Sequence, residues 1–453
     1  MTVLEEKLKE SNKKLKEFSE ESKEKIKEIS KEISNEIKEI SMESREKLME
    51  ISNEIKERSM ESKEKLEKMS MESKEKLKEI SMESKEKLKE ISKEFKEISS
   101  HMKIDWAPID VPPRRRIQTL AAAFYVYVFM FLPFISLFLT AFFLLYLNYL
   151  GRALLLVYLT YIYFDHTKRA SALDGNGWKF LRNNFMAHHL RDYFPIELIK
   201  TAELTPDRNY LVVSFPHGII GTGVTNNMGN NIGKWLKLYP GIRPKIATLD
   251  MHFRIPFLRE VVRLWGLVSC SKQSLMYYLN KSNDPKHPDN RDGFTSNAVA
   301  LLVGGAEESL ESHPGRYVLV LKERKGFVKI AIRSGTPIVP SFSFGEVDIF
   351  DQVANPPDSM LRKFQTFVKH LTGVSPLIVL GRGLFQYTFG LLPHRRHIVQ
   401  VVGAPIEVKK MDEPDTKYVN EIHQKVIDSL YEMFEKYKYQ YIQNAEETKL
   451  VIR

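Results

Sequence analysis

A run of 35 residues without a charged side chain, from Ile117 to Gly151, constrains the fold more than any other feature. A run of this length and apolar content predicts a membrane segment rather than a core helix of a soluble protein. It is too long for one ordinary span and short for two, which need about 20 residues each. Pro133 lies near its middle. We therefore expect a helical hairpin with arms at about 117–133 and 134–150 and an apolar extension to residue 164.

Basic residues lie on both sides of this run, at Arg114–Arg116 before it and at Arg152, Lys168 and Arg169 after it. Positive residues next to membrane segments mark the cytosolic side. We therefore expect both ends of the hairpin, and the domain that follows, to lie in the cytosol. Such a hairpin needs no second aqueous side, because its helices satisfy their own backbone hydrogen bonds in hydrocarbon. It could sit in a bilayer or in the monolayer around a lipid droplet.

Residues 1–103 consist almost entirely of Glu, Lys, Ser, Ile, Leu and Met. The octapeptide SMESKEKL recurs at Ser59, Ser70 and Ser81, a period of eleven residues. Eleven residues make three helical turns, so the period predicts a long helix with a narrow, nearly straight apolar stripe. The stripe favours a coiled coil, as a homo-oligomer or with a partner helix; a lipid surface and a solvated helix remain alternatives. No apolar segment follows Met1, so we expect no cleaved secretory signal.

The positive charge belongs to the second part of the chain. Residues 1–103 carry 26 Lys and Arg against 27 Asp and Glu, whereas the remaining 350 residues carry 42 against 31. A basic excess fits anionic lipid or a phosphate-bearing ligand, and no nucleic-acid-binding motif is present. The single cysteine, Cys270, excludes an intrachain disulfide and fits a reducing compartment. We expect it to be a buried apolar residue rather than a nucleophile.

Residues 165–440 show the mixed pattern of an α/β domain with a largely parallel sheet. A linker at 104–116 precedes the hairpin, and a tail at 441–453 follows the domain. Short apolar runs predict strands, and longer periodic segments predict helices. A C-terminal amphipathic helix is expected over Asp412–Tyr439, with Ile422, Val426, Leu430 and Met433 on one face. The expected strands are Tyr210–Ser214, Val318–Leu321, Ile338–Phe342 and Ile398–Val402, and the expected helices are Ser296–Leu302 and Phe327–Ser334.

The first candidate site is the block Phe215–Gly218, FPHG, which follows the apolar run of an expected strand. Its single titratable side chain is His217. A histidine at the carboxyl end of a strand, on a turn of small residues, is placed to act as a base. Pro216 fixes the turn, and Gly218 lets a substrate approach the backbone. A purely structural histidine is the alternative.

The second candidate site is the block Leu301–Leu310, LLVGGAEESL. The glycine pair Gly304 and Gly305 can present backbone N–H groups to a ligand, and Glu307 and Glu308 add carboxylates beside them. A surface turn followed by the acidic first turn of a helix explains the same residues. No cluster of residues has the spacing of metal ligands.

The third candidate site is basic. Lys329 and Arg333 are four residues apart on one face of an expected helix, and Arg324 and Lys325 come just before it. Together the four cations form a compact basic patch next to a helix that starts at a glycine, and such a patch is suited to binding phosphate groups. A solvated basic helix face is the alternative.

From about Arg114 to Tyr439, the chain resembles the diacylglycerol acyltransferase type 2 family, which includes monoacylglycerol and wax-ester acyltransferases. The residues that carry the resemblance form ordered blocks, and a hydrophobic hairpin before the catalytic domain matches as well. Residues 1–103 lie outside it. The blocks are YFP at 193–195, FPHG at 215–218, HFRIPFLRE at 252–260, VGGAEESL at 303–310, RKGFVKIA at 324–331, IVPSFSFGE at 338–346, GRGLF at 381–385, GLLP at 390–393 and VVGAPIEV at 401–408.

The resemblance implies an acyl-CoA-dependent O-acyltransferase that makes triacylglycerol from diacylglycerol at the endoplasmic reticulum or the lipid droplet. Monoacylglycerol or a wax alcohol is the alternative acceptor, and acyl-CoA is a co-substrate, so no cofactor is implied. A non-enzymatic membrane tether with a coiled-coil helix is the alternative of a different class.

Two departures from the family's motifs bear on the catalytic residues. Many relatives have a histidine where this chain has Phe215, which leaves His217 as the base of the block. Related glycerolipid acyltransferases carry an aspartate five residues after the histidine, where this chain has Thr222. The residue that orients His217 is therefore open among Glu307, Glu308 and Asp250. We rank Glu307 first and expect Phe215, Pro216, Gly218, Gly304 and Gly305 to contact substrate, with the four cations holding CoA phosphates.

Overall fold

The computed structural model describes residues 104–168, 177–231, 233–288, 290 and 293–453, together with residues 71, 74, 75, 78 and 82. The chain divides into two compact units, Met1–Met102 and Lys103–Arg453. The five described positions of the first unit are helical and exposed. The expected coiled coil over residues 1–103 otherwise lies outside the described residues.

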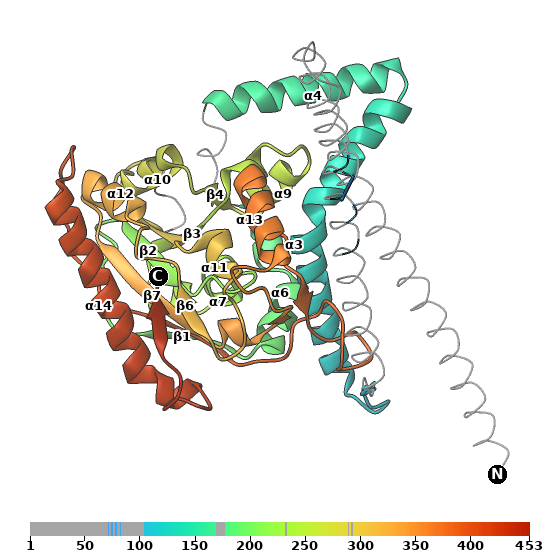
Figure 1. The fold of residues 1–453 in the computed structure, drawn as a ribbon. Helices are drawn as coiled ribbons and strands as arrows, with labels where there is room; N and C mark the ends of the chain where they lie inside the picture. Colours follow the sequence, from blue (N-terminus) through green and yellow to red (C-terminus); the bar gives the residue numbers. More distant parts are fainter. Residues whose placement is uncertain are drawn as a thin grey trace. The chain divides into compact units, whose positions relative to one another are not determined.

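The second unit is built on a seven-stranded sheet (Figure 1). Neighbouring strands run parallel except for the pair β10–β7, which is antiparallel. This confirms the expected α/β fold with a mostly parallel sheet. In spatial order the strands are β1 (Ile196–Lys200), β10 (Ile398–Val402), β7 (Ile338–Phe344), β2 (Tyr210–Phe215), β5 (Ser296–Leu302), β3 (Ile242–Thr248) and β4 (Leu267–Ser269).

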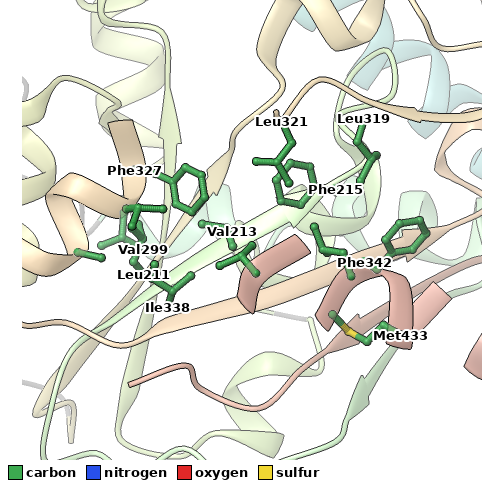
Figure 2. Packing of buried hydrophobic residues seen from close by; sticks show 14 of the residues in the cluster. Leu211, Val213, Phe215, Val299, Leu319, Leu321, Phe327, Ile338, Phe342 and Met433 are labelled. Carbon is green, nitrogen blue, oxygen red and sulfur yellow. The ribbon is translucent and has the colours of Figure 1, made fainter. Parts of the chain in front are cut away.

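Helices cover both faces of this sheet. Successive side chains of a strand point to opposite faces, so β2 contributes to two cores. Leu211, Val213 and Phe215 belong to the larger cluster, shown in Figure 2, together with residues of α10 (Lys272–Leu279), α12 (Gly326–Ser334) and α14 (Thr416–Tyr441). Tyr210 and Val212 belong to the cluster formed with α7 (Thr222–Met228) and α8 (Trp235–Leu238). All six residues of β2 are buried, so the strand is central.

The expected helix over Ser296–Leu302 is wrong, because these residues form β5, between β2 and β3. A short apolar run that is buried on both faces has no alternation, and periodicity alone cannot separate it from a buried helix. The expected helix over Phe327–Ser334 is confirmed as α12, and the C-terminal helix as α14. The four expected strands are confirmed as β2, β6 (Tyr317–Leu319), β7 and β10.

Residues 117–146 of the apolar run lie in one helix, α3 (Pro113–Tyr146), which continues through Pro133. The expected turn at Pro133 is therefore wrong. In an apolar helix the one hydrogen bond that proline removes is tolerated, and the chain instead turns at Leu147 and Asn148 before α4 (Tyr149–Lys168). The Asn148 side chain accepts the N–H of Gly151 at 2.9 Å, and Arg152 donates to the carbonyls of Leu145 and Leu147. These contacts stabilise the corner seen in Figure 1.

Both arms of this helical pair return to the α/β unit. The first half of α3 is buried through Ala121, Ala122 and Val126, whereas large side chains of its second half are exposed. On α4, Asp165 forms an ion pair with the buried Arg259 of α9 (Leu258–Leu264). Among the described residues, α3 is the helix long and apolar enough to cross a membrane.

The segments expected to be linker and tail are part of the fold. Asp105 exchanges hydrogen bonds with Tyr387 and Thr388, and α3 already begins at Pro113. In the tail, β11 (Leu450–Ile452) pairs with β6. The other elements are α5 (Lys179–Arg182), α6 (Phe185–Tyr193), η2 (Asp250–Phe253), α11 (Gly305–Ser309), η3 (Glu346–Asp348), β8 (Asp351–Gln352), α13 (Met360–Thr372) and β9 (Val379–Leu380).

Candidate active site

Three neighbouring parallel strands, β7, β2 and β5, end at the same edge of the sheet. The residues that follow them therefore meet, although they are far apart in the sequence. His217 follows β2, Glu346 follows β7, and the glycine pair with α11 follows β5. The sheet thus brings the first two candidate blocks together.

The side chain of His217 is held by its Nδ1 atom. Nδ1 lies 2.9 Å from the hydroxyl of Ser309 on α11 and 3.2 Å from the carbonyl oxygen of Gly218. A carbonyl oxygen only accepts hydrogen bonds, so this geometry assigns the proton to Nδ1. Ser309 then accepts from Nδ1–H and donates its own hydroxyl to the carbonyl of Gly305, 3.4 Å away. This tautomer leaves the lone pair on Nε2.

The electrostatic surroundings keep His217 neutral. Its burial lowers its pKa below the usual value, because a buried imidazolium loses hydration. The neutral form with a lone pair on Nε2 is the form that can accept a proton from a substrate hydroxyl. His217 therefore has the protonation state of a general base at neutral pH.

Glu308 fixes the backbone at His217. Its Oε1 accepts the backbone N–H of His217 at 2.5 Å, and its Oε2 accepts that of Val320 at 2.8 Å. Burial raises the pKa of Glu308 to about 7, although the two N–H groups act in the opposite direction. The carboxyl group fills the space beside Gly304, where a Cβ atom would collide with it. Gly304 is therefore required for packing, not only for the approach of a ligand.

Glu346 has the same role on the other side of the histidine loop. Its two oxygens accept the N–H groups of Thr222 and Gly223 at 2.7 and 2.8 Å, at the start of α7. Its side chain also lies where a Cβ atom of Gly218 would be. Burial raises the pKa of Glu346 to about 7. Two buried carboxyl groups thus bracket the segment from His217 to Gly223.

The expected partner of His217, Glu307, makes other contacts. It pairs with Arg324 at 2.7 Å and with Lys369 at 3.6 Å. Burial alone would raise the pKa of Glu307, but these two cations lower it overall. Asp250 contacts Arg254 and Ser269 instead. The residues that contact His217 from α11 are therefore Ser309 and Glu308.

The remaining predicted residues fall into two groups. Phe215 is fully buried in the core of Figure 2, and Pro216 is buried next to it. The basic residues lie before and along α12, where Arg324 is bound to Glu307 and Arg333 donates to the carbonyl of Asp412. Lys329 is exposed on the same helix. The structure therefore connects one of the four cations, Arg324, directly to α11.

The profile of the family described as "Diacylglycerol acyltransferase" matches residues 143–453. The chain belongs to this family. It is therefore an acyltransferase, as the resemblance implied.

Relatives with three different acceptor names are similar to the chain. "Diacylglycerol O-acyltransferase 2" from Dictyostelium discoideum is 39% identical over 74% of this chain and 96% of its own length. "2-acylglycerol O-acyltransferase 1" from Bos taurus is 37% identical over 75% of this chain and 97% of its own. "Acyl-CoA wax alcohol acyltransferase 1" from Mus musculus is 37% identical over 58% of this chain and 76% of its own length.

Two residues of the site were not singled out from the sequence. Ser309 follows the two glutamates directly, and Glu346 ends the block IVPSFSFGE, but neither has a motif that reveals its partner. Among the described residues, no group of three or more His, Cys, Asp or Glu side chains is arranged to hold a metal ion. Burial raises the pKa of Cys270, which fits an unreactive thiol.

Proposed function

We propose that this acyltransferase moves a long-chain acyl group from acyl-CoA to the free hydroxyl of diacylglycerol, with His217 as the general base. The observation that carries the proposal is the contact of His217 Nδ1 with Ser309, which leaves Nε2 free to accept a proton. Relatives named for diacylglycerol, 2-acylglycerol and wax alcohol keep the two other acceptors as alternatives. Family membership weighs against the membrane tether.

In the proposed reaction, Nε2 takes the proton of the acceptor hydroxyl while the oxygen attacks the thioester carbonyl. The tetrahedral intermediate carries its negative charge on the former carbonyl oxygen. Backbone N–H groups of Gly218 or of Gly304 and Gly305 would stabilise this charge. The C–S bond then breaks, and the CoA thiolate takes the proton from Nε2. The products are triacylglycerol and CoA.

Binding of acyl-CoA is assigned to Arg324, Lys325, Lys329 and Arg333, which would hold its phosphate groups. We place the enzyme at the endoplasmic reticulum membrane or the lipid droplet, with its α/β domain in the cytosol. The placement is supported by the basic residues at the start of α3 and at the end of α4, and by the return of both helices to the same unit.

The experiment is an acceptor panel. The full chain in vesicles receives one labelled acyl-CoA and, in turn, diacylglycerol, 2-monoacylglycerol or a long-chain alcohol. The proposal predicts that labelled triacylglycerol forms from diacylglycerol faster than the products of the other two acceptors form. A higher kcat/KM with monoacylglycerol or the alcohol would show that this acceptor, not diacylglycerol, is the preferred substrate. No transfer to any of the three would contradict the proposed reaction.

A further inference from the structure

Helix α13 buries a polar side chain and exposes apolar ones, the opposite of an amphipathic helix that packs on the core of a soluble protein. The one side chain of α13 that is fully buried is the polar Gln365. Four of its large apolar side chains are exposed, at positions four, three and four residues apart, so they share one face. The four are Met360 (73% exposed), Phe364 (50%), Phe367 (66%) and Leu371 (76%).

The polar face of α13 is held in place by specific contacts. Gln365 accepts from the side chain of Asn355 at 3.1 Å and donates to the carbonyl of Pro376 at 3.0 Å. Arg362 donates to the carbonyl of Leu310 and pairs with Glu311. A rotation that buried the apolar face would break these bonds and leave buried polar groups without partners. The outward direction of the apolar face is therefore built into the fold.

The same contacts connect α13 to the catalytic histidine. Arg362 binds Leu310, which directly follows Ser309, and Lys369 pairs with Glu307 on α11. Ser375, three residues after α13, donates to the carbonyl of Ala306 on α11. Helix α11 carries both residues that contact His217. The polar face of α13 thus covers the element that holds the base.

The exposed apolar surface continues from α13 toward α3. Val374, Ile378 and Leu380 are exposed in the segment that follows the helix. Between the last two, Val379 is buried in one cluster with residues of the first half of α3, including Val126. α3 is apolar and long enough to cross a membrane. An exposed apolar surface that is continuous with such a helix is suited to contact with lipid.

The charge of α13 fits the same occupant. The helix contains Arg362, Lys363, Lys369 and His370 and has no acidic residue. Lys363 and His370 are exposed beside the apolar stripe. Basic residues flanking an apolar face are typical of helices that lie in the plane of an anionic membrane surface.

We propose that α13 lies in the surface of the membrane, with Met360, Phe364, Phe367 and Leu371 among the acyl chains. This second contact, beside α3, brings α11 and His217 to the lipid surface. If the proposed acceptor is correct, its hydroxyl then reaches the base without leaving the lipid. Contact with lipid itself does not depend on which acceptor reacts.

The test uses the full chain with Cys270→Ser, reconstituted in phosphatidylcholine vesicles with and without phosphatidylserine. An environment-sensitive fluorophore is attached to a single new cysteine, Phe367→Cys on α13 or Tyr439→Cys on α14. The two positions are matched, since their side chains are 66% and 64% exposed. Lipids with a nitroxide on the acyl chain then quench any label that reaches the hydrocarbon.

We expect several-fold stronger quenching at position 367 than at position 439, and a further increase with phosphatidylserine. Equal quenching at both positions would overturn the proposal. So would protection of position 367 that depends on protein concentration and not on nitroxide lipid, because a second copy would then cover the face. Since quenching needs no turnover, failure of the proposed reaction would leave this result unchanged.

A kinetic measurement separates docking from folding. The variant Phe364→Ser, Phe367→Ser, Leu371→Ser changes only exposed side chains. It should raise the apparent KM for the acceptor in the vesicle several-fold and leave the KM for acyl-CoA unchanged. An unchanged acceptor KM in a folded variant would contradict the role of α13 in bringing the site to the lipid.

Discussion

Helices α13 and α14 are both amphipathic, yet they face in opposite directions. Helix α14 buries Ile422, Val426 and Leu430 in the core and turns its charged side to water. Helix α13 buries Gln365 and exposes its phenylalanines. In the view of Figure 1, α14 lies on one side of the sheet and α13 on the side of α3. An amphipathic pattern therefore defines two faces without deciding which of them packs inward.

The partners of each helix explain the difference. α14 packs on the apolar side chains of β7, including Phe342 and Phe344. α13 instead meets carbonyl groups and amide side chains, such as those of Leu310, Pro376 and Asn355, which need hydrogen-bond donors or acceptors. The polar face of α13 supplies them, and its apolar face is left for another environment.

The largest expected effect on stability is in α14. Leu430→Ala removes a fully buried side chain and should lower the free energy of unfolding by about 2–5 kcal/mol. The matched change in α13, Leu371→Ala, removes a side chain that is 76% exposed and should cost less than about 0.5 kcal/mol in detergent. Urea unfolding of the two variants measures both values. Equal losses would mean that α13 packs on protein, and the contrast would fail.

The next effect tests whether α13 keeps water away from Glu308 on α11. The folded pKa of Glu308 is raised to about 7 from a usual 4.5, so the native state binds more protons than the unfolded state between these values. The contribution of Glu308 to stability therefore falls as the pH rises from 4.5 to about 7, by at most about 3 kcal/mol. Unfolding of the wild type relative to Glu308→Gln, followed across this range, measures it. A difference that stays constant with pH would show that water reaches Glu308.

The smallest effect concerns the buried polar residue of α13. Gln365→Leu makes the helix more apolar but leaves Asn355 and the carbonyl of Pro376 without these partners. We expect a loss of about 1–3 kcal/mol in the free energy of unfolding. Gln424→Leu, on the exposed face of α14, is the control and should be nearly neutral. Increased stability of Gln365→Leu would indicate that the polar contacts do not determine the direction of α13.

Much of the fold follows from local sequence patterns. The strands β2, β7 and β10 and the helices α12 and α14 lie where apolar periodicity and turn residues predict them. β5 cannot be distinguished from a helix by its sequence, because a central strand buried on both faces has no alternating pattern. The sequence favours a turn at Pro133 over one at Asn148, because proline is the stronger helix breaker, but an apolar helix accommodates it.

The residues of the site could likewise be predicted only in part from the sequence. A histidine at the end of a strand could be predicted from the block FPHG. Its partner could not, because successive residues of a helix point about 100° apart. Glu307, Glu308 and Ser309 are adjacent on α11, but they contact Arg324, the backbone of His217 and the ring of His217, respectively. Only the three-dimensional arrangement distinguishes them.

The most direct test of the central claim is the rate of acyl transfer by His217→Ala. The full chain and the variant are reconstituted in equal amounts in vesicles that contain diacylglycerol, and the labelled triacylglycerol formed from acyl-CoA is measured. Loss of the general base should reduce kcat by about 10²–10⁴-fold. Ser309→Ala, which keeps Nε2 but removes the contact to Nδ1, should give a smaller loss. A His217→Ala protein that transfers acyl groups within threefold of the wild-type rate would contradict the account.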